Sequence, residues 1–271
     1  MMNSTEQGAT GRDPSLAVDW TGRAVECAGC AHLDLLHQNT CGPLWSCVHD
    51  RYAPRIDRFF ATHSELANAY LAHPYFEVRA VAAKHADLFR LPALLEDPDE
   101  TVRWSAVARL PARMVARLAR DPDREVRIRV AARIDSGQLT RMLEDPDYYV
   151  RQVVARRVPT DLLPLLAADP DTEVRKVVAA RAEGGLLPRL ARDPEAEVRL
   201  IAVERMAPWQ LIPLAADADW RVRHVLARRM PPQYLGALLT DPDDEVRRTA
   251  RERAAVGQCE GSSPHSLAGQ E

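Results

Sequence analysis

Apolar side chains recur along most of this chain with a period of 24 residues. The clearest marker is the pair Val-Arg, which occurs eight times without a slip, at Val78-Arg79, Val102-Arg103, Val126-Arg127, Val150-Arg151, Val174-Arg175, Val198-Arg199, Val222-Arg223 and Val246-Arg247. A second apolar residue often follows four positions later, as Val130 follows Val126. This spacing places both side chains on one face of a helix. A period of about 20 to 50 residues is typical of a stacked array, in which each repeat buries its core against its neighbours.

Each repeat begins with a polar dipeptide that predicts a helix start. Asp-Pro stands at Asp97-Pro98, Asp121-Pro122, Asp145-Pro146, Asp169-Pro170, Asp193-Pro194 and Asp241-Pro242, whereas the first and seventh repeats carry His73-Pro74 and Asp217-Ala218. Aspartate accepts hydrogen bonds from free N–H groups at a helix start, and proline suits the first helical position. A second acid such as Asp99 would then lie in the first turn, where the helix dipole favours negative charge. We therefore expect an α-helix to begin at each Asp-Pro.

A shorter apolar motif follows each of these helices. It consists of two residues three positions apart: Leu91 and Leu94, Val115 and Leu118, Leu139 and Met142, Leu163 and Leu166, Leu187 and Leu190, Leu211 and Leu214, and Leu235 and Leu238. This spacing in a short segment predicts one or two turns of 3₁₀-helix or α-helix. The alternating strand pattern of ordinary leucine-rich repeats does not occur. We therefore expect an all-α solenoid with two short helices in each repeat, ending in a polar cap at the eighth repeat.

Four cysteines lie close together ahead of the array, at Cys27, Cys30, Cys41 and Cys47. The first two form a C-x-x-C motif, the third follows after ten residues, and the fourth after five more. Soft thiolate ligands in a short segment with small neighbours can wrap a metal centre. The spacing alone leaves three alternatives open: an iron–sulfur cluster, a structural zinc ion, and thiols that are reactive or simply buried.

Other residues near these cysteines are weaker candidates. His32, His37 and His49 lie close enough in sequence to replace a thiolate, although solvated or hydrogen-bonded histidines are the more usual case. Trp45 lies between the third and fourth cysteines and is expected to pack over the metal site. Cys259 stands alone near the C-terminus and is expected to be a free thiol.

Two columns of arginines repeat with the array, and they allow two interpretations. One column follows the valines, and the other comprises Arg109, Arg133, Arg157, Arg181, Arg205, Arg229 and Arg253. Arginines repeated along a solenoid could follow the phosphates of a nucleic acid. In the structural interpretation, the first column pairs with an acid four residues earlier, as Arg103 with Asp99, and the second column lies in the last helical turn, where a cation suits the dipole.

Composition narrows the class of protein further. The 271 residues carry a net charge of −3 and are 46% hydrophobic, which permits a core but argues against a domain built mainly to bind nucleic acid. No apolar run approaches the ~20 residues of a membrane span, and the polar N-terminus does not resemble a secretory signal. Five cysteines then indicate metal ligands in a cytoplasmic protein. We find no motif typical of a catalytic site.

These patterns predict four segments. Residues 1–16 are expected to be disordered, 17–72 to form a cysteine-rich domain that holds the candidate metal centre, with bridging helices, 73–255 to form the array of eight repeats, and 256–271 to form a flexible tail. In the bridging helices, Leu66, Tyr70 and Leu71 echo the second half of a repeat.

The repeat motif D-P-D-x-E-V-R-x-x-V-A-x-R, behind a cysteine-rich segment, resembles the leucine-rich repeat variant proteins from about Asp19 to Arg253. The resemblance implies a right-handed superhelix of alternating α- and 3₁₀-helices. It also implies a four-iron, four-sulfur cluster held by Cys27, Cys30, Cys41 and Cys47. It offers no reaction. The first repeat departs from the motif at His73 and His85, and the seventh departs at Ala218 and Arg221.

We therefore expect a [4Fe–4S] cluster-binding protein whose array is a scaffold for an unidentified protein partner, with electron transfer or redox sensing as the role of the cluster. The alternatives are a zinc-headed structural scaffold and a helical-repeat protein that binds nucleic acid through its arginine columns.

Overall fold

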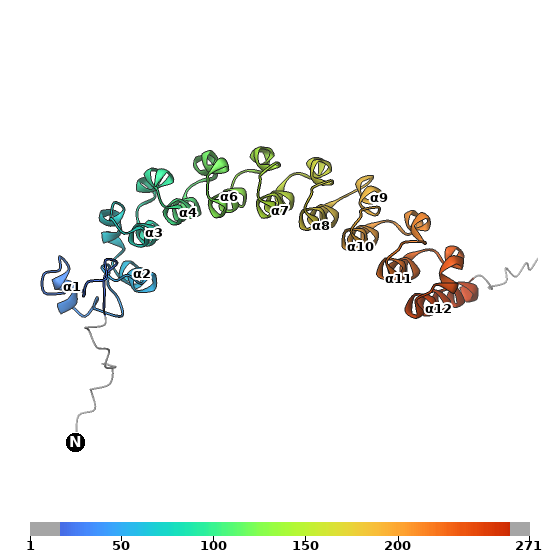
Figure 1. Cartoon of the computed structure of the whole chain (residues 1–271), viewed down its shortest axis with the longest axis horizontal. Helices are drawn as coiled ribbons and strands as arrows, with labels where there is room; N and C mark the ends of the chain where they lie inside the picture. Colours follow the sequence, from blue (N-terminus) through green and yellow to red (C-terminus); the bar gives the residue numbers. More distant parts are fainter. Residues whose placement is uncertain (1–16, 261–271) are drawn as a thin grey trace, which may run out of the picture. The chain divides into compact units, whose positions relative to one another are not determined.

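The computed structural model describes residues 17–260 (Figure 1). The predicted disorder of residues 1–16 and the predicted flexibility of residues 261–271 lie outside these described residues. Residues 256–260 continue the last helix, α12 (Asp244–Glu260). Between residues 17 and 260 the regular structure is helical, with two isolated β-bridges that join Val18 to Ala24 and Gly42 to Ser46. The expected all-α class is confirmed. No helix in this range is long and apolar enough to span a membrane.

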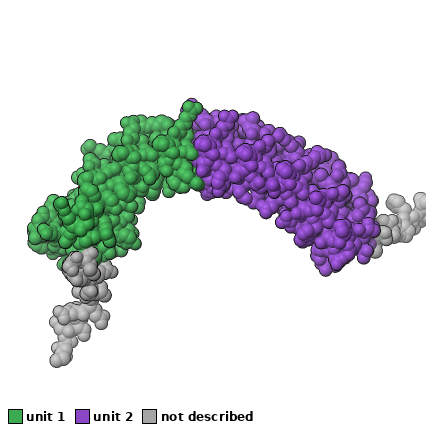
Figure 2. Space-filling model, in the orientation of Figure 1, with its two compact units in different colours: residues 1–135 green, residues 136–271 purple. Residues whose placement is uncertain are grey.

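The chain divides into two compact units, residues 1–135 and residues 136–271 (Figure 2). The helices of the first unit are α1 (Leu33–His37), α2 (Ala53–Thr62), η2 (Ser64–Tyr70), α3 (Phe76–His85), η3 (Leu88–Glu96), α4 (Glu100–Arg109), α5 (Ala112–Val115), η4 (Ala116–Arg120) and α6 (Arg124–Ala131). Elements labelled η are 3₁₀-helices.

The second unit continues the same alternation. Its helices are η5 (Ser136–Met142), α7 (Tyr148–Arg157), η6 (Thr160–Leu166), α8 (Thr172–Arg181), α9 (Leu186–Leu190), α10 (Ala196–Arg205), η7 (Pro208–Leu214), α11 (Trp220–Arg229), η8 (Pro232–Tyr234), η9 (Gly236–Thr240) and α12. The predicted pairing of one α-helix with one short 3₁₀ or α segment is therefore confirmed.

Within each unit, the long α-helices pack side by side and enclose the core between successive repeats. All eight valines of the Val-Arg pairs are fully buried, as the period predicts. The apolar partner four residues later is buried with them, for example Val178 behind Val174. The first leucine or valine of each short segment, such as Leu163, closes the same core from the other side of the repeat.

The α-helices begin later than the sequence analysis predicts. Helix α4 begins at Glu100, and the Asp99 carboxylate accepts a hydrogen bond from the Thr101 N–H, so the second acid and not the Asp-Pro aspartate is the N-cap. Asp97 instead accepts the N–H of Asp99 in the turn before the helix, at 2.9 Å. The physical reason is that the Asp-Pro dipeptide forms the turn that leads into the helix, and the aspartate there has a second partner.

That partner is the valine-adjacent arginine of the preceding repeat. Arg103 donates two hydrogen bonds to Asp121, 18 residues ahead, with both N···O distances 2.8 Å. A third N–H group of Arg103 donates to the backbone carbonyls of Asp97 and Pro98. The same bidentate pair recurs at Arg79–Asp97, Arg151–Asp169, Arg175–Asp193, Arg199–Asp217 and Arg223–Asp241. From Arg103 onward, the predicted pairing with the acid four residues earlier is therefore wrong for these arginines; Arg79 has Tyr75 at that position.

The second arginine column also links repeats. Arg109 donates to the carbonyls of Ala83 and Ala86, at the end of the preceding helix α3. Arg205 does the same for Ala180 and Ala182 at the end of α8. These carbonyls lack partners within their own helix, so the cation satisfies them and complements the helix dipole. Both columns are therefore engaged inside the array, which leaves these guanidinium groups little freedom to bind phosphates.

The bridging residues form a repeat-like unit at the start of the array. Helices α2 and η2 both pack against α3, and the 3₁₀-helix η2 includes Tyr70, as its resemblance to the second half of a repeat predicts. His73 occupies the place of the Asp-Pro aspartate. Its Nδ1 accepts the N–H of Tyr75 at 3.1 Å, just as Asp97 accepts the N–H of Asp99.

Candidate metal centre

The four candidate cysteines lie on two loops of the first unit. Cys27 and Cys30 precede the short helix α1, and the N–H of Cys30 donates to the carbonyl of Cys27 at 3.1 Å in a tight turn. The N–H of Leu33 then donates to the carbonyl of Cys30, which begins α1. Consecutive turns of this kind keep the two thiols of a C-x-x-C motif close to each other.

Cys41 and Cys47 flank the second loop, which closes on itself. Gly42 and Ser46 exchange two backbone hydrogen bonds, and Leu44 between them adopts a left-handed conformation with φ of 65°. A side chain at Gly42 would collide with the Trp45 indole, because a Cβ atom there would lie 2.4 Å from Trp45 Nε1. Trp45 therefore packs on Gly42, next to Cys41. The loop requires glycine at this position.

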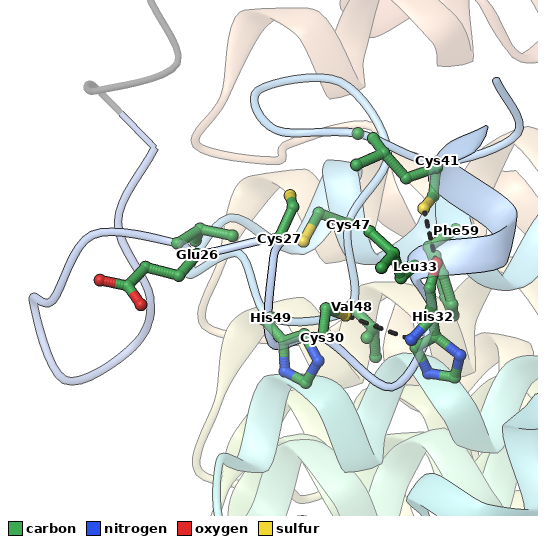
Figure 3. A pocket seen from close by; sticks show the side chains of 13 residues that line it. Glu26, Cys27, Cys30, His32, Leu33, Cys41, Cys47, Val48, His49 and Phe59 are labelled. Atoms are coloured by element: carbon green, nitrogen blue, oxygen red, sulfur yellow. Dashed lines mark hydrogen bonds between the residues drawn. The ribbon is translucent and has the colours of Figure 1, made fainter.

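All four cysteines line one cavity, which has about 340 Å³ of empty space including a part open to solvent (Figure 3). Cys47 is buried, and the other three are half-buried. The rest of the lining is largely apolar: Val25, Leu33, Leu36, Val48 and Phe59 contribute to it. The four cysteines that are close in sequence therefore also lie around one cavity. Among residues 17–260, no three His, Cys, Asp or Glu side chains converge tightly enough to hold a single metal ion.

Burial in this cavity opposes ionisation of the thiols. It raises the pKa of Cys47 to about 12, and it raises the pKa of Cys27 and Cys41, with a further contribution from the neighbouring Cys30. The cause is that a thiolate loses its hydration in apolar surroundings and repels the other sulfurs. A cationic metal centre would compensate for both effects, and its binding would release protons. Four soft sulfur donors around one apolar cavity fit an iron–sulfur group.

The three candidate histidines are placed differently. His32 and His49 line the cavity, and burial lowers the pKa of both imidazoles, so they are neutral at physiological pH. Nε2 of His32 shares a short hydrogen bond with the hydroxyl of Tyr70. His37 is exposed at the end of α1, outside the lining. Tyr70 lies 38 residues from His32 in the sequence, and no motif links the two positions, so the sequence does not predict this contact.

Comparison with known proteins agrees with this fold and site. Residues 17–69 match the family model described as LRV protein FeS4 cluster. A solved structure of a leucine-rich repeat variant with a novel repetitive protein structural motif is 38% identical, with a TM-score of 0.81. The match covers 84% of this chain and 98% of that one.

The fold and the matched segment define a helical-repeat solenoid with an N-terminal iron–sulfur domain, and the chain belongs to the leucine-rich repeat variant family. A curated relative, the uncharacterized 27.7 kDa protein in nifB 3'region of Rhodobacter capsulatus, is 57% identical over 95 residues. This match covers 35% of the present chain and 39% of the relative.

Proposed function

We propose that Cys27, Cys30, Cys41 and Cys47 together hold one [4Fe–4S] cluster and that the protein takes part in electron transfer or redox sensing. When bound, such a cluster supplies one-electron chemistry. The observation that carries the proposal is that four thiols from two loops line a single apolar cavity inside the segment matched by the FeS4 family model.

The arrangement of the sulfurs favours a cluster over the zinc alternative. The thiols are spread around the wall of a cavity. This suits a polynuclear cluster, whose irons take separate thiolates, better than one Zn²⁺ ion, whose four ligands converge at about 2.3 Å. The apolar wall would limit access of water, and the loops would hold the four donors in place. Free thiols of this kind persist in a reducing compartment, so we infer a cytoplasmic location.

The test is the variant Cys30→Ser, purified without oxygen and compared with the parent protein. Cys30 is a proposed ligand that belongs to a surface loop, so its loss should abolish the broad visible absorption, the iron and the acid-labile sulfide. Helical circular dichroism should change little because the array has its own buried core. Cys259→Ser is the matched control, since Cys259 lies outside the matched segment, and it should keep the full cluster content.

Two results would contradict the proposal. One is stoichiometric zinc without acid-labile sulfide in the parent protein, which would support the zinc-headed scaffold. The other is an undiminished cluster content in Cys30→Ser.

We further infer that the array is a protein-interaction scaffold. Helical solenoids present extended surfaces, and the second unit exposes large rings on successive elements, including Trp209, Trp220 and Tyr234. The nucleic-acid alternative has less support, because the recurring arginines are hydrogen-bonded to aspartates and carbonyls of the array itself.

A further inference from the structure

His32 contacts two of the proposed ligands through its backbone. Its N–H donates to Sγ of Cys30 at 3.4 Å, and its carbonyl accepts from the thiol of Cys41 at 3.9 Å (Figure 3). The second contact requires a protonated Cys41, whereas the first one strengthens when Cys30 is a thiolate. The peptide N–H of His32 is therefore the group that would act on the sulfur of a bound cluster.

Residues outside the cysteine loops hold the side chain of His32. Its imidazole packs against Phe59, with ring centroids 5.3 Å apart, and Nε2 shares a hydrogen bond with the Tyr70 hydroxyl. Burial raises the pKa of Tyr70 to about 12, so the phenol keeps its proton. The Tyr70 ring is in turn fixed by Phe60 and His73, at centroid distances of 5.5 and 6.0 Å.

Tyr70 belongs to the bridging helix η2 rather than to the cysteine loops. It is the last residue of η2, which packs against α3, and it lies one position beyond the segment matched by the FeS4 family model. The hydrogen bond to His32 thus joins the bridging helix η2, which packs against α3, to the backbone that touches the proposed ligand Cys30.

We propose that Tyr70 is a positioning residue for the cluster, which holds His32 so that its peptide N–H stays directed at Sγ of Cys30. This inference rests on the proposed function. Hydrogen bonds to cluster sulfurs are one of the factors that set the reduction potential. An N–H dipole directed at sulfur favours the more negative, reduced cluster, so its loss lowers the potential.

The experiment compares Tyr70→Phe with the matched control Tyr75→Phe in the full-length, anaerobically prepared protein. Both variants keep the ring and lose only the hydroxyl. The Tyr75 hydroxyl donates to the carbonyl of Arg51 at 3.0 Å and not to a cavity residue. Iron and acid-labile sulfide are measured first, and the midpoint potential is then determined by a spectroscopic redox titration. We expect a full cluster in both variants, a lower midpoint potential in Tyr70→Phe, and an unchanged one in Tyr75→Phe.

A second pair of variants tests whether Tyr70 acts through His32. In a His32→Ala background, the further change Tyr70→Phe should produce no additional shift, because the hydrogen-bond partner is already absent. If a variant takes up less cluster, the comparison still holds, because the midpoint potential is measured only on protein that carries a cluster.

The outcomes separate the two proposals. An equal midpoint potential in the loaded parent protein and loaded Tyr70→Phe overturns the role of Tyr70 and leaves the cluster standing. A Tyr70→Phe shift that persists in the His32→Ala background also overturns it. A parent protein without iron and acid-labile sulfide overturns the proposed function, and the inference falls with it.

Discussion

At the scale of single residues, the array depends on a buried ion pair that recurs from repeat to repeat. Arg151 and Asp169 are representative, with side-chain exposures of 11% and 3% and an N···O distance of 2.7 Å. Asp169 also accepts the N–H of Asp171, and Arg151 also donates to the carbonyl of Asp145. One pair therefore fixes the turn before two successive α-helices and satisfies groups that are shielded from water.

We predict that Asp169→Ala destabilises the protein by about 3 to 5 kcal/mol. The reason is that the change leaves the Arg151 guanidinium buried without its carboxylate, and removal of one partner of a buried pair typically costs this much. Urea unfolding measures the change in free energy. The control is Glu197→Ala, which removes an exposed partner of Lys176 and should cost far less than the loss of Asp169, because solvent screens an exposed pair. Equal losses for the two variants would contradict the structural role of the pair.

The sequence does not reveal the ion pair between Arg151 and Asp169, although each residue recurs at a fixed position of the repeat. An acid four residues before each arginine offers a familiar local partner, whereas the observed partner is 18 residues ahead. Only the stacking of repeats brings this aspartate close to the arginine. The contact between Tyr70 and His32 is hidden for a similar reason, because it joins two segments that share no periodic signal. The departures at His73 and His85 are visible hints that this end of the array differs.

At the scale of the helix, the two acids at the start of most repeats have different roles. Before α4, α6, α8 and α11 the side chain of the second acid caps the helix, and the first acid binds arginine. Glu195 before α10 makes no side-chain cap hydrogen bond. The helices and their buried faces are predictable from the sequence because the same pattern recurs eight times. The predicted helix starts are too early because both acids satisfy the general preference for negative charge at a helix start.

We predict that Asp99→Ala lowers stability by about 1 kcal/mol, whereas Asp99→Asn has a much smaller effect. The alanine variant loses the acceptor for the Thr101 N–H, and asparagine retains an acceptor at the same position. Thermal unfolding followed by circular dichroism distinguishes the two. If both variants lose the same stability, the charge of Asp99 matters more than its role as a cap.

At the scale of the whole molecule, the stability of a repeat array is approximately a sum of repeats and the interfaces between neighbours. In the second unit, α8 packs against both α7 and α10, whereas α12 packs against α11 at the end of the array. Val174 on α8 and Val246 on α12 are both fully buried. The two valines therefore differ in the number of neighbouring repeats and not in burial.

This difference leads to a prediction about Val174→Asp and Val246→Asp. Each change buries an unpaired carboxylate in an apolar core, which costs several kcal/mol. We expect a larger fall in the thermal midpoint for Val174→Asp, because the damaged repeat loses interfaces on both sides, whereas Val246→Asp can be relieved by fraying of α12 alone. Val256→Asp is the control, since Val256 is 61% exposed on α12 and its substitution should have little effect. A Val246→Asp variant as unstable as Val174→Asp would show that the array unfolds as one cooperative body and not by loss of its end repeat.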